Sequence, residues 1–137
     1  MICAQMTTPI NATSAARIAV LLVDDERALL DVMRLGLEKE FDVETASSAA
    51  DAEMLLATGR HDVIVCDHLM PDEVGLDFLI NAARWHPRAK RILITGYMNP
   101  ELISRSVQIA GLSACLLKPV PPEQLRSAIR TSLVGPT

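Results

Sequence analysis

Short apolar runs alternate five times with longer stretches in which apolar residues recur every three or four positions. The runs are residues 17–23, 41–46, 62–67, 91–94 and 114–117. An apolar run this short, bounded by polar residues, is typical of a strand buried in a sheet, and the longer stretches are typical of amphipathic helices. Five strand–helix repeats predict a parallel sheet with right-handed crossovers and helices on both faces.

The alternation predicts an α/β fold of the flavodoxin-like, doubly wound (βα)5 type. For five strands the common order in the sheet is 2-1-3-4-5, which makes the first and third strands neighbours at its centre. The chain has 137 residues, the size of one domain. We expect this domain to occupy residues 17–134, with residues 1–16 as a flexible N-terminal tail and residues 135–137 as a C-terminal tail.

Composition narrows the class of protein. The net charge is −4 and the 13 basic residues are scattered, so we expect no direct binding of nucleic acid. No apolar run approaches the length of a membrane span, and the N-terminal residues lack the apolar core of a secretory signal. Cys3, Cys66 and Cys115 show no metal-binding spacing. We therefore expect a cytoplasmic protein with no membrane association.

Apolar spacing also predicts which side chains are buried. The helix expected from about residue 74 should pack through one apolar face, and so should the helix that begins at Pro100. These faces are Leu76, Leu79, Ile80 and Ala83 in the first helix, and Leu102, Ile103, Ser106, Val107 and Ala110 in the second. His61, His68 and His86 share no ligand spacing and are expected at the surface.

Acidic residues stand where the two central strands end. Asp24 and Asp25 follow the first strand, and Asp67 ends the third. Taken alone, Asp67 is equally well explained as a helix cap. In the predicted strand order, however, these carboxyl ends meet at the point where ligands bind in such sheets. Three carboxylates in one pocket raise one another's pKa unless a cation is present, and an all-oxygen set suits Mg²⁺. We predict a Mg²⁺ site formed by Asp24, Asp25 and Asp67, with the main-chain carbonyl of Leu69 as a further ligand.

The fourth and fifth strands bring Thr95 and Lys118 to the same edge. A hydroxyl and an ammonium group there complete a site for a phosphoryl group. Asp67 is then available as a nucleophile, as carboxylates are in proteins that pass through an aspartyl phosphate. The predicted roles are phosphoacceptor for Asp67, charge neutralisation for Lys118 and hydrogen-bond donation for Thr95.

The ordered set of strand-end motifs resembles the receiver domain of two-component response regulators. The motifs are Val23-Asp24-Asp25-Glu26, Asp67 with Met70-Pro71 and Gly75, Thr95-Gly96, and Leu117-Lys118-Pro119. The resemblance implies that Asp67 accepts a phosphoryl group from a phosphohistidine on a sensor histidine kinase or a histidine phosphotransfer protein. It also implies a cis peptide bond between Lys118 and Pro119. The output face would comprise the fourth helix, fifth strand and fifth helix, which would bind an effector or a second copy of the chain.

Position 115 departs from the family pattern. The family usually carries an aromatic residue three positions before the lysine, which turns inward on phosphorylation, and this chain has Cys115 there. That departure keeps open an adaptor that works without phosphorylation. A small phosphohydrolase with an aspartyl nucleophile is the other alternative, but the adjacent Asp24 and Asp25 lack the two-residue spacing of such enzymes. The main interpretation is a signalling module rather than an enzyme that turns over a metabolite.

Overall fold

The computed structural model describes residues 17–68, 74–96 and 100–134 and contains one five-stranded parallel sheet. The strands are β1 (Ala19–Val23), β2 (Asp42–Ala46), β3 (Val63–Asp67), β4 (Lys90–Thr95) and β5 (Ala114–Leu117). The helices are α2 (Arg27–Leu37), α3 (Ala49–Leu56), α4 (Gly75–Trp85), α5 (Pro100–Ala110) and α6 (Pro122–Val134). The strand order is β2-β1-β3-β4-β5, which confirms the predicted α/β fold and topology.

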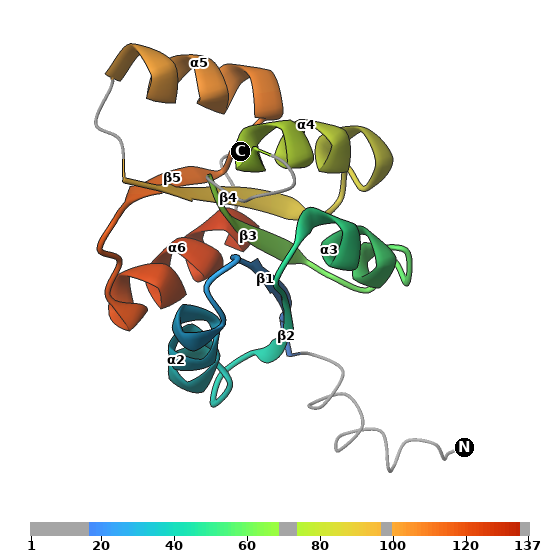
Figure 1. Ribbon diagram of the computed structural model, residues 1–137, viewed down its shortest axis with the longest axis vertical. Coiled ribbons are helices and arrows are strands. Elements are labelled where there is room, and N and C mark those ends of the chain that lie inside the picture. The colour runs from blue at the N-terminus through green and yellow to red at the C-terminus, as the bar shows by residue number, and fades with distance from the viewer. Residues whose placement is uncertain (1–16, 69–73, 97–99, 135–137) are drawn as a thin grey trace.

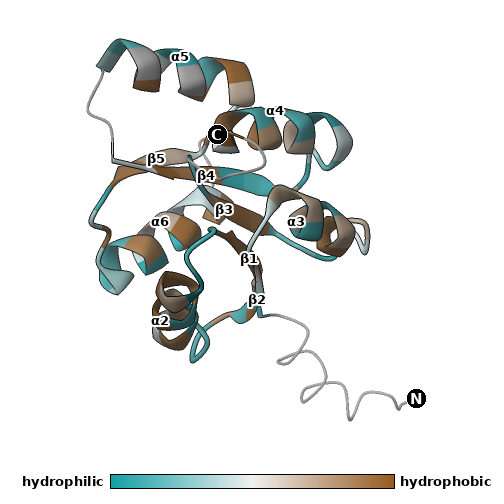
Figure 2. Ribbon diagram, viewed as in Figure 1, coloured by the Kyte–Doolittle hydropathy of each residue, from teal (hydrophilic) through white to brown (hydrophobic). Residues whose placement is uncertain are grey.

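Helices cover both faces of the sheet, with α3, α4 and α5 on one side and α2 and α6 on the other (Figure 1). Each face has its own core of buried apolar side chains, one formed with α3, α4 and the end of α5, the other with α2 and α6. Figure 2 shows brown, hydrophobic segments along the central strands and along the helix sides that face them. This is the two-sided burial that the continuous apolar runs predicted.

Strand β3 is the centre of the sheet, and each of its residues is buried. It pairs with β1 through Val23 and Cys66 and with β4 through Asp67 and Ile94, in parallel register. Because all the strands run the same way, their carboxyl ends lie at a single edge. The sequence that follows each strand therefore supplies the groups at that edge.

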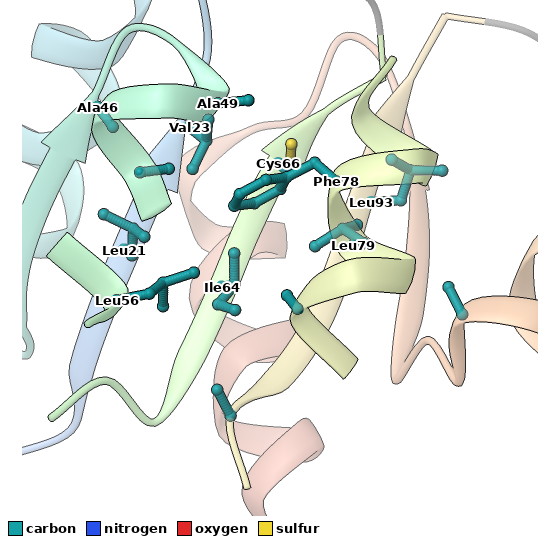
Figure 3. Close-up of a cluster of buried hydrophobic side chains, with 14 of the residues drawn as sticks. Leu21, Val23, Ala46, Ala49, Leu56, Ile64, Cys66, Phe78, Leu79 and Leu93 are labelled. Carbon is teal, nitrogen blue, oxygen red and sulfur yellow. The ribbon is translucent and has the colours of Figure 1, made fainter. Parts of the chain in front are cut away.

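The buried face of α4 differs from the predicted one. Phe78 and Ala82 are buried with Leu79, whereas Leu76 and Ile80 are only partly buried. Figure 3 shows Phe78 and Leu79 reaching from α4 toward β3, with the Phe78 ring beside Ile64 and Cys66. The large aromatic ring fills the space over the central strand, and this rotates the contact face of the helix from the predicted position.

Two further expectations on burial were wrong. Val107, predicted to face the core from α5, is 37% exposed. His61, predicted at the surface, is buried, and its Nε2 lies 2.6 Å from Oε1 of Glu44 in β2. The side chains of Leu102 and Ser106 lie outside the described part of the structure. Among the described residues, none of the helices has the length and apolar character needed to cross a membrane.

Candidate functional site

Four strands deliver polar groups to one edge of the sheet. Asp24 and Asp25 follow β1, Asp67 is the last residue of β3, Thr95 is the last residue of β4, and Lys118 follows β5. Because β1, β3 and β4 pair in parallel register, the residues at the ends of these strands, Asp24, Asp67 and Thr95, lie side by side. The fold thus brings together the side chains that the sequence placed at separate strand ends.

The three carboxylates form one cluster. Asp24, Asp25 and Asp67 each offer an oxygen, and these atoms lie within 4.8 Å of one another. Asp24 is 2% exposed and Asp67 is 6% exposed, whereas Asp25 is exposed to solvent. The cluster is therefore buried on its inner side and open on its outer side. A ligand can reach it from solvent without a change in the fold.

The electrostatics of Asp24 fit a cation at this position. The pKa of Asp24 is raised from 3.8 to about 6, mainly by burial and also by the charges of Asp67 and Asp25, against the lowering effects of the Glu26 N–H and of Lys118. The Glu26 main-chain N–H donates to Asp24 Oδ1 at 2.9 Å, which orients the carboxylate. Asp24 is hard to ionise even though the Lys118 ammonium group is nearby. A further positive charge at the cluster would stabilise its ionised form. Three carboxylates with only oxygen donors suit a hard divalent cation.

Lys118 pairs directly with Asp67, since its Nζ lies 2.7 Å from Asp67 Oδ1. Burial lowers the pKa of the Lys118 ammonium, but its hydrogen bond and attraction to Asp67, with the charges of Asp24 and Glu26, raise the pKa above its ordinary value overall. Lys118 is therefore positively charged at neutral pH. Its main-chain N–H donates to the Thr95 carbonyl at 2.8 Å, and the Lys118–Pro119 peptide bond is cis, as the resemblance implied.

Thr95 and Gly75 complete the surroundings of Asp67. Thr95 is 5% exposed and follows Ile94, the residue that pairs with Asp67 across β3 and β4. A Cβ atom added to Gly75 would overlap the main-chain carbonyl of Asp67. Only glycine lets the first turn of α4 approach the end of β3 this closely. The predicted ligand Leu69 lies in residues 69–73, outside the described residues.

A hollow beside the carboxylates was not predicted from the sequence. It has a volume of about 420 Å³. Its polar lining comes from Asp24, Glu26 and Lys118, and its apolar lining comes from Leu29, Met33, Ile94, Pro119 and Val120. These residues belong to the segment between β1 and α2, to α2, to β4 and to the segment after β5, so no local pattern joins them. The only signal in the sequence is that Leu29 and Met33 lie four positions apart on one helix.

Comparisons with known proteins agree with this geometry. Residues 20–130 match the family described as the response regulator receiver domain. The hydrogenase transcriptional regulatory protein HoxA of Cupriavidus necator is 40% identical over 114 residues, which are 83% of this chain and 24% of that protein. The chain spans about a quarter of the length of the curated relatives first matched.

Solved structures of other proteins share the fold. A response regulator receiver domain protein from Clostridium thermocellum superposes with a TM-score of 0.79 at 27% identity, covering 85% of this chain and 94% of that one. A response regulator from Burkholderia pseudomallei, solved with a phosphorylated aspartic acid, calcium ion and citrate, has a TM-score of 0.75 at 23% identity. That match covers 85% of this chain and 70% of the other.

Proposed function

Because the chain belongs to the receiver domain family of response regulators, we propose that Asp67 accepts a phosphoryl group from a phosphohistidine. The donor would be a sensor histidine kinase or a histidine phosphotransfer protein. The observation that carries the proposal is the contact of 2.7 Å between Lys118 Nζ and Asp67 Oδ1 within a cluster of three carboxylates. The described residues hold no other group of three or more metal-ligating side chains.

The chemistry assigned to these residues is an in-line phosphoryl transfer. A carboxylate oxygen of Asp67 bonds to phosphorus, the bond from phosphorus to the histidine nitrogen breaks, and the imidazole leaves. Such transfers need alignment and charge neutralisation more than covalent help from the protein. Lys118 lies where its ammonium group can neutralise a phosphoryl oxygen bound to Asp67. The Thr95 hydroxyl, at the same edge, is assigned as a hydrogen-bond donor to another oxygen.

Asp24, Asp25 and Asp67 would hold Mg²⁺, with the Leu69 carbonyl as a further ligand. When bound, Mg²⁺ supplies positive charge that neutralises phosphoryl oxygens. The exposure of Asp25 leaves the cluster open to an incoming ion. The phosphorylated aspartic acid and calcium ion in the Burkholderia pseudomallei regulator support this assignment by likeness of fold.

The proposed output is a conformational signal rather than a released product. Phosphorylation of Asp67 would alter the hydrogen bonds of Thr95 and the surface next to it. The face formed by α5, β5 and α6 would then bind an effector or a second copy of the chain. The relative HoxA is a transcriptional regulatory protein. By likeness to it, the proposed result of the signal is control of transcription, through a longer partner protein or a longer polypeptide.

Incubation of the purified protein with Mg²⁺ and acetyl phosphate tests the proposal. We expect a stable phosphoryl group on the wild-type protein, no uptake in the presence of EDTA, and no uptake by Asp67→Asn. Rapid release of phosphate without accumulation would favour the phosphohydrolase alternative. The absence of uptake under all conditions would favour the adaptor and contradict the proposal.

A further inference from the structure

Two adjoining hollows form a groove between α3 and α4, which cover the same face of the sheet (Figure 1). The first hollow has a volume of about 380 Å³ and the second about 270 Å³. Leu56, Trp85 and His86 line both hollows, so the two are continuous, whereas Glu53 lines only the first and Arg88 only the second. We call this surface the α3–α4 groove. None of its lining residues belongs to the phosphoryl site.

The α3–α4 groove has an apolar floor and an exposed aromatic rim. Leu56 of α3 and Phe78 of α4 are buried and line the first hollow, and Figure 3 shows both directed toward β3. Trp85, the only tryptophan of the chain, is 72% exposed at the last position of α4. Tryptophan carries much of the binding energy at many protein interfaces, because its ring buries a large area at a low cost in conformational entropy. The groove is therefore suited to bind another protein surface.

The two ends of the groove carry opposite charges. Glu53 at one end and Arg88 at the other are both exposed, and Trp85 and His86 lie between them. Within the part of the chain that the structure describes, neither Glu53 nor Arg88 forms an ion pair. Each charge is thus available to a binding partner.

A second copy of the chain matches this charge pattern. Consider two copies related by a two-fold axis that passes through the middle of the groove, near Trp85, at right angles to its length. The two grooves then run in opposite directions, and Glu53 of each copy lies opposite Arg88 of the other. Such a contact is isologous, so the favourable charge pair occurs twice and the two Trp85 rings meet at the centre. A partner surface of one uniform charge would be repelled at one end of the groove.

We propose that the α3–α4 groove is the interface of a homodimer, with Trp85 as its central anchor and a pair of Glu53 with Arg88 at each end. This interface is separate from the proposed output face of α5, β5 and α6, and it does not require phosphorylation of Asp67. The contact involves parts of two short helices, which is little surface for a protein interface. The dimer is therefore weak, with a dissociation constant on the order of 10–100 µM.

Sedimentation velocity of the full chain, without a phosphodonor, tests for the dimer at protein concentrations from about 5 to 500 µM. We expect the average mass to rise toward that of two copies. Fluorescence in the same range reports on Trp85 alone, since the chain has no other tryptophan. Its emission should shift to shorter wavelength as the dimer forms, because the ring leaves water.

A chain that stays monomeric over the whole range would overturn the proposal. Emission typical of an exposed ring would then show that the groove is empty, and emission typical of a buried ring would show that a segment of the same chain covers it.

An alanine substitution locates the interface. Trp85→Ala should raise the dissociation constant at least about tenfold. Because Trp85 is largely exposed, this substitution should leave the circular dichroism spectrum unchanged. The matched control is Leu35→Ala, which removes another exposed apolar side chain, on α2 at the opposite face of the sheet. The control should change the dissociation constant less than about twofold. A dimer that Trp85→Ala leaves unchanged must form through another surface, and the proposal would be wrong.

Charge reversal tests the pairing across the two-fold axis. Glu53→Arg and Arg88→Glu each place like charges opposite one another at both ends, and each should raise the dissociation constant about tenfold. In an equimolar mixture of these two variants, opposite charges face each other again at both ends. The mixture should therefore associate about as tightly as the wild-type protein. A mixture that associates no better than either variant alone would contradict the proposed arrangement.

Discussion

The burial of Asp24 predicts that this acid destabilises the metal-free protein at neutral pH. Its pKa is about 6 in the folded chain, against 3.8 as the ordinary value. A shift of about two units corresponds to about 3 kcal/mol, and we reduce this to about 2 kcal/mol because solvent reaches the cluster beside Asp25 and screens the charges. We expect Asp24→Asn to raise the free energy of unfolding by that amount at pH 7.5 without divalent cations.

The sign of the effect follows from proton binding. Between pH 4 and 6 the folded state binds more protons at Asp24 than the unfolded state does, so stability falls as the pH rises through this window. Well below pH 3.8 the residue is protonated in both states and costs nothing. Asparagine does not titrate, and its Oδ1 still accepts the Glu26 N–H. The gain from Asp24→Asn should therefore be small near pH 3.5 and complete above about pH 7.

Urea denaturation between pH 3.5 and 8, in EDTA and in excess Mg²⁺, measures this difference. Mg²⁺ should stabilise the wild-type protein more than Asp24→Asn, because an ion that binds only the folded state adds to its stability. The same gain at pH 3.5 as at pH 7.5, or a loss of stability at pH 7.5, would refute the assignment of a buried, hard-to-ionise carboxylate.

Three other substitutions, one of them with a matched control, probe the site and the core. Lys118→Met removes the ammonium group from Asp67 and should slow phosphoryl uptake from acetyl phosphate by about 100-fold while the circular dichroism spectrum is retained; an unchanged rate would exclude a role for this amine. Gly75→Ala should cost about 2–3 kcal/mol in urea unfolding through overlap with the Asp67 carbonyl, whereas Gly96→Ala, with open space around its Cβ, should be nearly neutral. Equal costs for the two would contradict the close approach. Leu79→Ala should cost about 2–5 kcal/mol because this side chain is fully buried, and a cost below 1 kcal/mol would argue against the described packing of α4.

The sheet and its strand order could be predicted from the sequence because each strand is recognisable from its own short run of apolar residues. Four consecutive apolar residues before Asp67, and similar runs elsewhere, have no polar face to expose, so they belong inside a covered sheet. Alternation with helices then restricts the topology, since crossovers are right-handed and the sheet needs cover on both sides. The position of the site could then be predicted, because the carboxyl ends of neighbouring parallel strands lie at the same edge of the sheet.

Side-chain environments were harder to predict where they depend on distant residues. Residues 74–83 carry apolar side chains on more than one side of the helix, so spacing alone did not decide between the predicted face and the one that buries Phe78 and Ala82. His61 is buried because Glu44, 17 positions earlier, supplies a carboxylate next to it. Arg91 donates hydrogen bonds to the carbonyls of Ala110 and Gly111, which lie about 20 positions later in the chain. The spacing of apolar residues along the chain does not predict such contacts.

The central claim is that phosphoryl transfer ends on the carboxylate of Asp67. The most direct test is to phosphorylate the protein with a histidine kinase or phosphotransfer protein in Mg²⁺, and then to locate the modified residue by peptide mass spectrometry after reductive trapping of the acyl phosphate. The account predicts modification of Asp67 alone, lost in Asp67→Asn. Modification of Asp24 or Asp25 in the wild-type protein, or undiminished uptake by Asp67→Asn, would contradict it.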